Sequence, residues 1–125
     1  MPPSPEASSS PQIRCIVTSF EQEEQAADII RTLVRERHIA CGNILRSVRS
    51  IYIWQDKLED TEEVIAILKT TSTMAALAGE RLRELHPYDV PEILVLTPEA
   101  VETAYADWVA KTVQDHPVNF PCSSA

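Results

Sequence analysis

The chain has 125 residues, of which 44% are hydrophobic and 24% are charged, and this composition is typical of one globular domain. It carries 11 basic and 19 acidic side chains, so its net charge of −8 argues against nucleic acid and anionic membrane surfaces as partners. Because its three cysteines form no C-x-x-C pair, we expect neither a disulfide framework nor a dedicated zinc site, and we predict a cytoplasmic location.

Proline- and serine-rich segments flank the predicted domain. Residues 1–11 contain four prolines and four serines, and residues 117–125 have a similar polar composition. Neither segment has enough apolar side chains to offset the entropy of ordering, so we expect two disordered tails. The folded part is therefore predicted to be a single domain over residues 12–116.

The pattern of apolar and polar residues between the tails predicts the secondary structure. In chain order we expect a strand at 13–17, a helix that begins after Ser19, extended stretches at 39–54 and 57–71, a helix capped by Ser72 or Thr73, a strand at 93–96 and a helix over about 98–113. A tight turn at Gln55-Asp56 joins the two extended stretches, and a shift in the apolar alternation indicates a bulge near residues 42–46. The order β-α-β-β-α-β-α predicts an α+β protein with the ferredoxin-like split β-α-β pattern and a long central hairpin.

Two features of the predicted sheet indicate self-association. Residues 13–17, 64–68 and 93–96 are apolar at nearly every position, which is typical of strands buried on both faces. Right-handed crossovers nevertheless place both main helices on one face. The stretch at 39–54 spans about 50 Å when extended and the strand at 93–96 only about 13 Å, so the hairpin projects beyond the sheet. An exposed apolar ribbon of this kind needs a partner strand. We expect a symmetric oligomer, and the alternative is a hairpin bent back over its own sheet.

Several spaced segments of the chain form a specific pattern. They are Thr18-Ser19-Phe20, Ile39-Ala40-Cys41-Gly42-Asn43, Ser50-Ile51-Tyr52-Ile53-Trp54, Glu63 with Lys69-Thr70-Thr71, His86-Pro87-Tyr88-Asp89-Val90-Pro91-Glu92-Ile93, and Tyr105 with Trp108. Together they resemble the CutA divalent-cation tolerance family over about residues 13–113. Two departures are local: the family's Thr-x-Pro has no proline here, and Asp56 stands where glycine is usual.

The resemblance implies a ferredoxin-like protomer in a homotrimer whose hairpins extend into neighbouring subunits. It also implies an association with tolerance of copper and other divalent cations, with copper binding proposed and no enzymatic reaction established. The architecture is similar to that of the P-II signalling proteins, which are trimers that bind ligands in clefts between subunits.

Metal-ligand positions of the family are matched here in part. Some bacterial relatives have a cysteine directly before Thr-x-Pro and two adjacent histidines before Pro-Tyr, but Val17 and Leu85 occupy two of these positions and only His86 matches. Cys15 shares a strand face with Val17 and is a candidate soft ligand for copper, and Cys41 is another candidate. The alternative for His86 is a cap at the end of the second helix, and the alternative for both thiols is packing.

A second group of residues is predicted to line a cleft between subunits. Glu59, Glu63 and Lys69 have odd numbers on one strand, so they share a face of the sheet. The whole set is Trp54, Glu59, Glu63, Lys69, Tyr88 and Glu92. Aromatic walls with a lysine and carboxylates suit a small anionic or zwitterionic ligand, and the alternative is an ion-pair network between subunits.

The sequence has no nucleophile elbow, no H-E-x-x-H helix and no P-loop. We therefore expect no enzymatic activity and no required cofactor, with copper or another divalent cation as the candidate ligand. The leading hypothesis is a CutA-like homotrimer that takes part in divalent-metal tolerance. The alternative is a small-ligand-sensing or scaffolding trimer without a specific metal.

Overall fold

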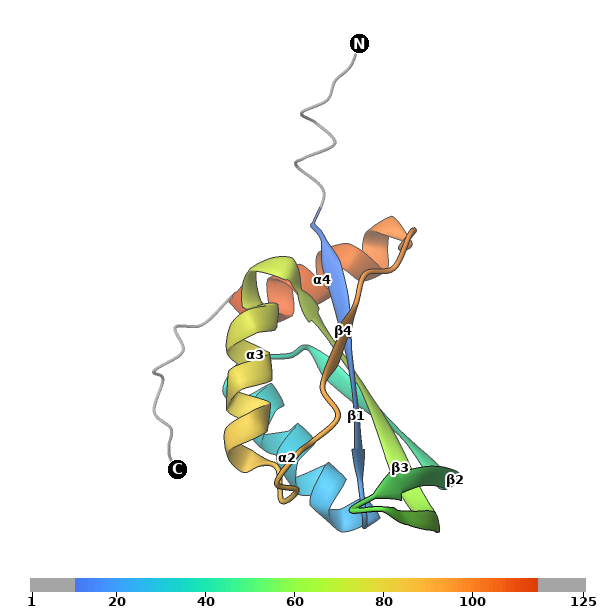
Figure 1. The fold of residues 1–125 in the computed structure, drawn as a ribbon. Coiled ribbons are helices and arrows are strands. Elements are labelled where there is room, and N and C mark those ends of the chain that lie inside the picture. Colours follow the sequence, from blue (N-terminus) through green and yellow to red (C-terminus); the bar gives the residue numbers. More distant parts are fainter. Residues whose placement is uncertain (1–10, 115–125) are drawn as a thin grey trace.

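The computed structural model describes residues 11–114, which form four strands and three helices (Figure 1). The elements are β1 (Ile13–Phe20), α2 (Glu23–Arg35), β2 (Cys41–Trp54), β3 (Lys57–Thr71), α3 (Ser72–Leu85), β4 (Leu94–Leu96) and α4 (Thr103–Gln114). This order confirms the predicted succession of strands and helices. The predicted tails lie outside the described residues, apart from Pro11.

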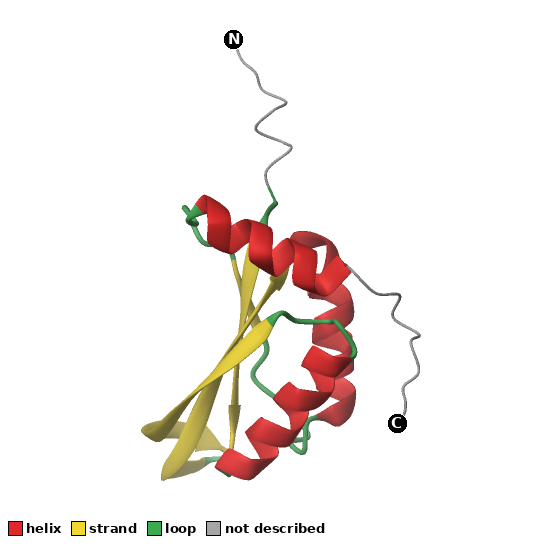
Figure 2. Ribbon diagram, turned by 180° about the vertical axis from the view of Figure 1, so that it is seen from behind, coloured by secondary structure: helices red, strands yellow, loops and turns green. Residues whose placement is uncertain are grey.

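The strands form one antiparallel sheet in the order β2-β3-β1-β4. Helices α2 and α3 lie on one face of this sheet, as both ribbon views show (Figure 1, Figure 2). Alternate side chains of the central strands, such as Ile16 on β1 and Leu68 on β3, pack with Leu33 of α2 and Leu82 of α3. Burying each such side chain contributes about 1.5–3 kcal/mol. The arrangement confirms the ferredoxin-like prediction.

Two helices begin later than the sequence predicted. Strand β1 continues through Phe20, so Ser19 lies in the strand, and the Gln25 side chain accepts a hydrogen bond of 3.2 Å from the Gln22 N–H at the start of α2. Helix α4 begins at Thr103 because the Glu102 carboxylate accepts a bond of 2.9 Å from the Tyr105 N–H. In both cases a nearby polar side chain satisfies a backbone donor of the first turn.

The outer half of the hairpin extends past β1. Strand β3 pairs with β1 only from Val64 to Thr71, so residues 57–63 pair with β2 alone. Gln55 and Asp56 form the predicted tight turn with φ of 52° and 67°, the left-handed values that a type I′ hairpin requires. The predicted bulge lies slightly further along, between Leu45 and Val48. The projecting hairpin is thus a feature of the protomer.

The sheet face opposite α2 and α3 is covered only at one end. Helix α4 packs there, with Val109 fully buried in a cluster that includes Ile13 and Ala40. Beyond it Leu94 and Leu96 are each 50% exposed. In the register, side chains on neighbouring strands continue this surface, which we call the open sheet face: Leu45, Ile65, Ile67, Val17, Leu94 and Leu96. Of the strands predicted to be buried on both faces, β1 and β3 are therefore buried on one face in the protomer, and every residue of β4 is exposed.

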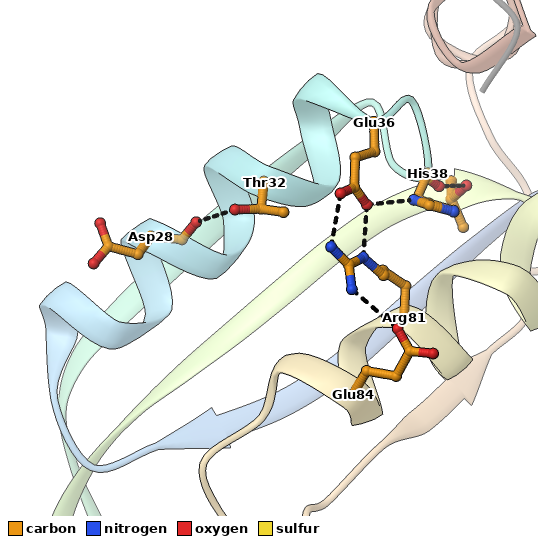
Figure 3. A network of polar contacts seen from close by, with 7 residues as sticks. Asp28, Thr32, Glu36, His38, Arg81 and Glu84 are labelled. Carbon is orange, nitrogen blue, oxygen red and sulfur yellow. Dashed lines mark hydrogen bonds and ion pairs between the residues drawn. The ribbon is translucent and has the colours of Figure 1, made fainter. Parts of the chain in front are cut away.

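An ion-pair network joins the end of α2 to α3 (Figure 3). The Nε and Nη2 atoms of Arg81 donate to the two carboxylate oxygens of Glu36, each at 2.8 Å, and Nη1 donates to Glu84 at 3.0 Å. His38 Nδ1 lies 3.2 Å from the same Glu36 carboxylate. The hydrogen bonds from Arg81 hold the pKa of Glu36 below its ordinary value, although burial acts in the opposite direction.

Replacing Arg81 by Met is expected to cost at most about 1 kcal/mol of stability near neutral pH, because the pair is partly exposed. The pKa of Glu36 is lower in the folded than in the unfolded chain. The stabilisation that ionised Glu36 gives the folded state is therefore complete above the ordinary pKa of 4.5, and it is lost as the pH falls through the pKa of the folded state. Urea unfolding from neutral to acidic pH measures this, with Arg83→Met as control. If the free energies of unfolding of Arg81→Met and the native protein differ by the same amount down to about pH 3, the proposed dependence on the ionisation of Glu36 is contradicted.

Candidate functional site

A pocket of about 590 Å³ opens where the hairpin leaves the sheet. Its walls come from the outer half of the hairpin, the end of β1 and the loop between α3 and β4. The charged and aromatic side chains that line it are Tyr52, Trp54, Glu63, Tyr88, Asp89 and Glu92. We call it the hairpin pocket. It lies at the point where the two-stranded part of the hairpin begins.

The structure brings together some of the predicted cleft residues and separates others. The hairpin pocket contains Trp54, Glu63, Tyr88 and Glu92. Glu59 pairs with Tyr52 nearer the hairpin tip and does not line the pocket. Lys69 lies six residues along β3 from Glu63, which corresponds to about 20 Å in an extended strand. Strand alternation places Glu63 and Lys69 on the same face of β3, but it does not show how far apart they lie along the strand.

Sequence reasoning missed two of the charged and aromatic residues in the pocket. Tyr52 lies two positions before Trp54 on β2, and residues two apart point to the same face of a strand. That alternation was a usable signal. Asp89 lies in the loop between α3 and β4, which has no repeating pattern, so its position depends on how the loop is held.

A hydrogen bond joins Tyr88 and Glu63, which both line the pocket. The Tyr88 hydroxyl donates a hydrogen bond of 2.7 Å to Oε2 of Glu63. Burial raises the pKa of Tyr88, and the hydrogen bond to Glu63 and the charge of that carboxylate raise it further. The phenol therefore remains a donor at neutral pH and fixes the carboxylate in place.

His86 anchors the loop that carries Tyr88. Its Nδ1 accepts a hydrogen bond of 3.1 Å from the Tyr88 N–H, so the neutral ring carries its proton on Nε2, which donates to the Ser19 carbonyl oxygen at 2.8 Å. The ring stacks on Phe20 with centroids 4.4 Å apart. Burial lowers the pKa of His86, opposed by the Ser19 hydrogen bond and the charge of Glu63.

The environment of the His86 side chain does not suit metal binding, whereas the position of the residue confirms the predicted cap at the end of α3. Both ring nitrogens are engaged, so neither has a lone pair free for a metal ion in this conformation. A neutral imidazole also adds little to the α3 dipole, although the His86 backbone N–H caps the helix by donating to Leu82 O at 2.9 Å. The structure gives the ring a positioning role, in which it holds β1 against the loop.

The two candidate thiols lie at the other end of the sheet, on the face that carries α4. In the register, Lys69 of β3 pairs with Cys15 on one side and Cys41 on the other, so the lysine stands between them. Lys69 donates a hydrogen bond to the Asn43 side chain. Cys41 Sγ lies 3.6 Å from the Tyr105 hydroxyl, and burial together with this contact raises the pKa of Tyr105 to about 12.

The charge of the hairpin pocket is negative. Glu63, Asp89 and Glu92 line it, and no lysine or arginine is among its lining residues. In one protomer Lys69 does not line this pocket, and the predicted cleft between subunits, with its anionic or zwitterionic ligand, stays a prediction. Carboxylates without a cationic partner attract positive charge, so the electrostatics of the pocket favour a cation.

The fold and the pocket define an α+β ferredoxin-like protein with a projecting hairpin and an acidic, aromatic pocket at its base. Residues 14–112 match the model of the CutA1 divalent ion tolerance protein family. The chain belongs to this family, which confirms the resemblance seen in the sequence.

Relatives and solved structures agree with this assignment. The chain is 43% identical over 94 residues to the divalent-cation tolerance protein CutA of Pyrococcus horikoshii, covering 75% of this chain and 91% of that protein. CutA1 from Ehrlichia chaffeensis has a TM-score of 0.80 at 30% identity, over 82% of this chain and 96% of that one. The periplasmic divalent cation tolerance protein CutA from Archaeoglobus fulgidus has a TM-score of 0.78 at 27% identity, over 82% and 99%. Within residues 11–114, every helix is too short or too polar to cross a bilayer.

Proposed function

We propose that the protein is a homotrimer that takes part in tolerance of divalent metal ions, copper among them. The open sheet face carries the self-association. Leu94 and Leu96 are each half exposed there, and stable monomers rarely leave a continuous apolar surface of this kind in water. Copies that meet through this face bury it and give the projecting hairpin partner strands. The number of subunits follows the family resemblance, and the biological role follows the names of the relatives.

Metal binding in this proposal is weak and involves no catalytic step and no required cofactor. Within residues 11–114, no three His, Cys, Asp or Glu side chains lie close enough together to hold a metal ion. Strong sites need three or four converging ligands, so a copper ion meets few side chains of one protomer. We place the protein in the cytoplasm, where the free thiols of Cys15 and Cys41 remain reduced.

His86→Ala is expected to leave copper binding unchanged and to destabilise the protein. The Ser19 carbonyl oxygen loses its donor and Phe20 loses its stacking partner, at a cost of about 1–3 kcal/mol. Calorimetric titration with Cu²⁺ and denaturant unfolding of both proteins measure the two effects, and His38→Ala controls for removal of an imidazole. Weaker copper binding in His86→Ala alone would contradict the positioning role and make His86 a ligand.

The hairpin pocket favours a second candidate function, the sensing of a small ligand by the assembled protein. Its volume of about 590 Å³ is within the range of small-molecule sites. Thermal-shift measurements against a panel of metabolites test this function, with stabilisation by at least one compound expected. If no compound stabilises the protein, the pocket has only a structural role.

A further inference from the structure

The hairpin pocket combines three aromatic side chains with three carboxylates, and this combination narrows the chemistry of its ligand. Tyr52 and Trp54 lie on the same face of β2, and Tyr88 lines the same pocket from the loop after α3. Aromatic rings attract cations through the negative potential of their faces, and tryptophan does so most strongly. Tyr52 and Trp54 remain 42% and 44% exposed, so their rings are accessible in the protomer.

The carboxylates supply the complementary charge. Glu63 is half-buried, and Tyr88 engages its Oε2. Within residues 11–114, no side chain or backbone group donates to the other oxygen, Oε1. Asp89 and Glu92 line the same pocket. A ligand with a donor N–H or a diffuse positive charge would meet a fixed, half-desolvated carboxylate, where charge attraction is stronger than in bulk water.

The geometry distinguishes an organic cation from a metal ion. A divalent metal ion needs several ligand atoms that converge on it, and for Mg²⁺ or Ca²⁺ these are oxygen atoms at about 2.0–2.6 Å. The described residues contain no group of three such side chains that could hold one, so the pocket carboxylates do not converge on a point. An ammonium group is satisfied by aromatic faces and separated carboxylates, and the pocket volume of about 590 Å³ is far larger than a metal ion requires.

We propose that the hairpin pocket binds a small organic cation with an ammonium group, held between Trp54, Tyr52 and Tyr88 and neutralised by Glu63. We propose a free small molecule and not a cationic side chain of another protein, because the pocket has room for a whole small molecule. This inference rests on the second candidate function, ligand sensing, and is independent of metal tolerance.

Calorimetric titration of the full chain with choline tests the proposal, and the neutral isostere 3,3-dimethyl-1-butanol is the ligand control. We expect saturable choline binding and at least about tenfold weaker binding of the alcohol, because only choline carries the charge. Glu63→Gln and Trp54→Leu are each expected to weaken choline binding at least about fivefold. Glu63→Gln keeps a hydrogen-bond acceptor for Tyr88, so it is the variant less apt to disturb folding.

Two matched controls separate the pocket from general effects. Glu62→Gln removes the same charge from the neighbouring position of β3, on the opposite face, and Trp108→Leu removes a comparably exposed tryptophan from α4. Both are expected to bind choline like the native protein.

Three outcomes would overturn the inference: no choline binding, equal binding of the alcohol, or equal losses in the control variants. Tighter binding of a trimethyl-lysine peptide than of choline would overturn the assignment to a free molecule. If compounds of another class stabilise the protein while choline does not, ligand sensing survives and the organic cation is rejected.

Discussion

Ile67→Glu is expected to convert the assembled protein into folded monomers. Ile67 lies on the open sheet face, where Val17 is its neighbour on β1 and Asn43 its neighbour on β2. A carboxylate at this position meets water in a monomer, but in an assembly it becomes an unpaired buried charge that costs several kcal/mol per subunit. Association is therefore weakened by orders of magnitude, whereas the core on the other face is untouched.

Sedimentation velocity at micromolar concentration measures the effect. The native protein is expected near three times its chain mass of 14.0 kDa, and the variant near one. Leu77→Glu is the control for introducing the same charge, because Leu77 is an apolar residue that is 50% exposed on the outer surface of α3, away from the open sheet face. A native monomer at this concentration, or an Ile67→Glu variant that remains assembled, would contradict the role of the open sheet face.

Phe20→Ala is expected to cost about 3–5 kcal/mol of stability, the largest effect of a single side chain that we predict. Phe20 is completely buried at the end of β1, where it belongs to the main core and stacks on His86. Its truncation leaves a cavity beneath the loop that carries Tyr88. Denaturant unfolding at one fixed protein concentration measures the loss, since unfolding of an oligomer depends on concentration.

Phe20→Leu provides the comparison, because it keeps most of the apolar volume and should cost much less. The ranking of the two variants then separates the cavity from the stacking contact with His86. If Phe20→Ala costs less than about 1 kcal/mol, the end of β1 does not hold the loop as described.

The elements that depend on local patterns were predicted well from the sequence. The apolar runs at 13–17 and 64–68 identified the central strands, and the unequal lengths of the extended stretches identified the projecting hairpin. The turn at Gln55-Asp56 was predicted because aspartate tolerates a left-handed backbone, and both residues have a positive φ in the structure. These features follow from residues that are close in the chain.

The candidate site was predicted only in part because it depends on contacts between distant segments. His86 bonds to Ser19, 67 positions away, and nothing in the local sequence indicates that both ring nitrogens are engaged. Lys69 shares the strand face of Glu63, but the sequence did not show that Glu63 lies beyond the part of β3 that pairs with β1, whereas Lys69 lies within it. Within one protomer the charged side chains that line the pocket are all acidic, because Lys69 lies about 20 Å away along β3.

One wall of the hairpin pocket lies on a ribbon that is only two strands wide. An isolated two-stranded ribbon is marginally stable in water. In a lone protomer we therefore expect residues 48–63 to open more readily than the core, and their amide protons to exchange faster than those of the core. Strands of a partner subunit would keep the two strands of the ribbon paired. Ligand affinity and assembly are then thermodynamically linked, because whatever steadies the ribbon promotes both, and dilution to single chains lowers the affinity for the ligand.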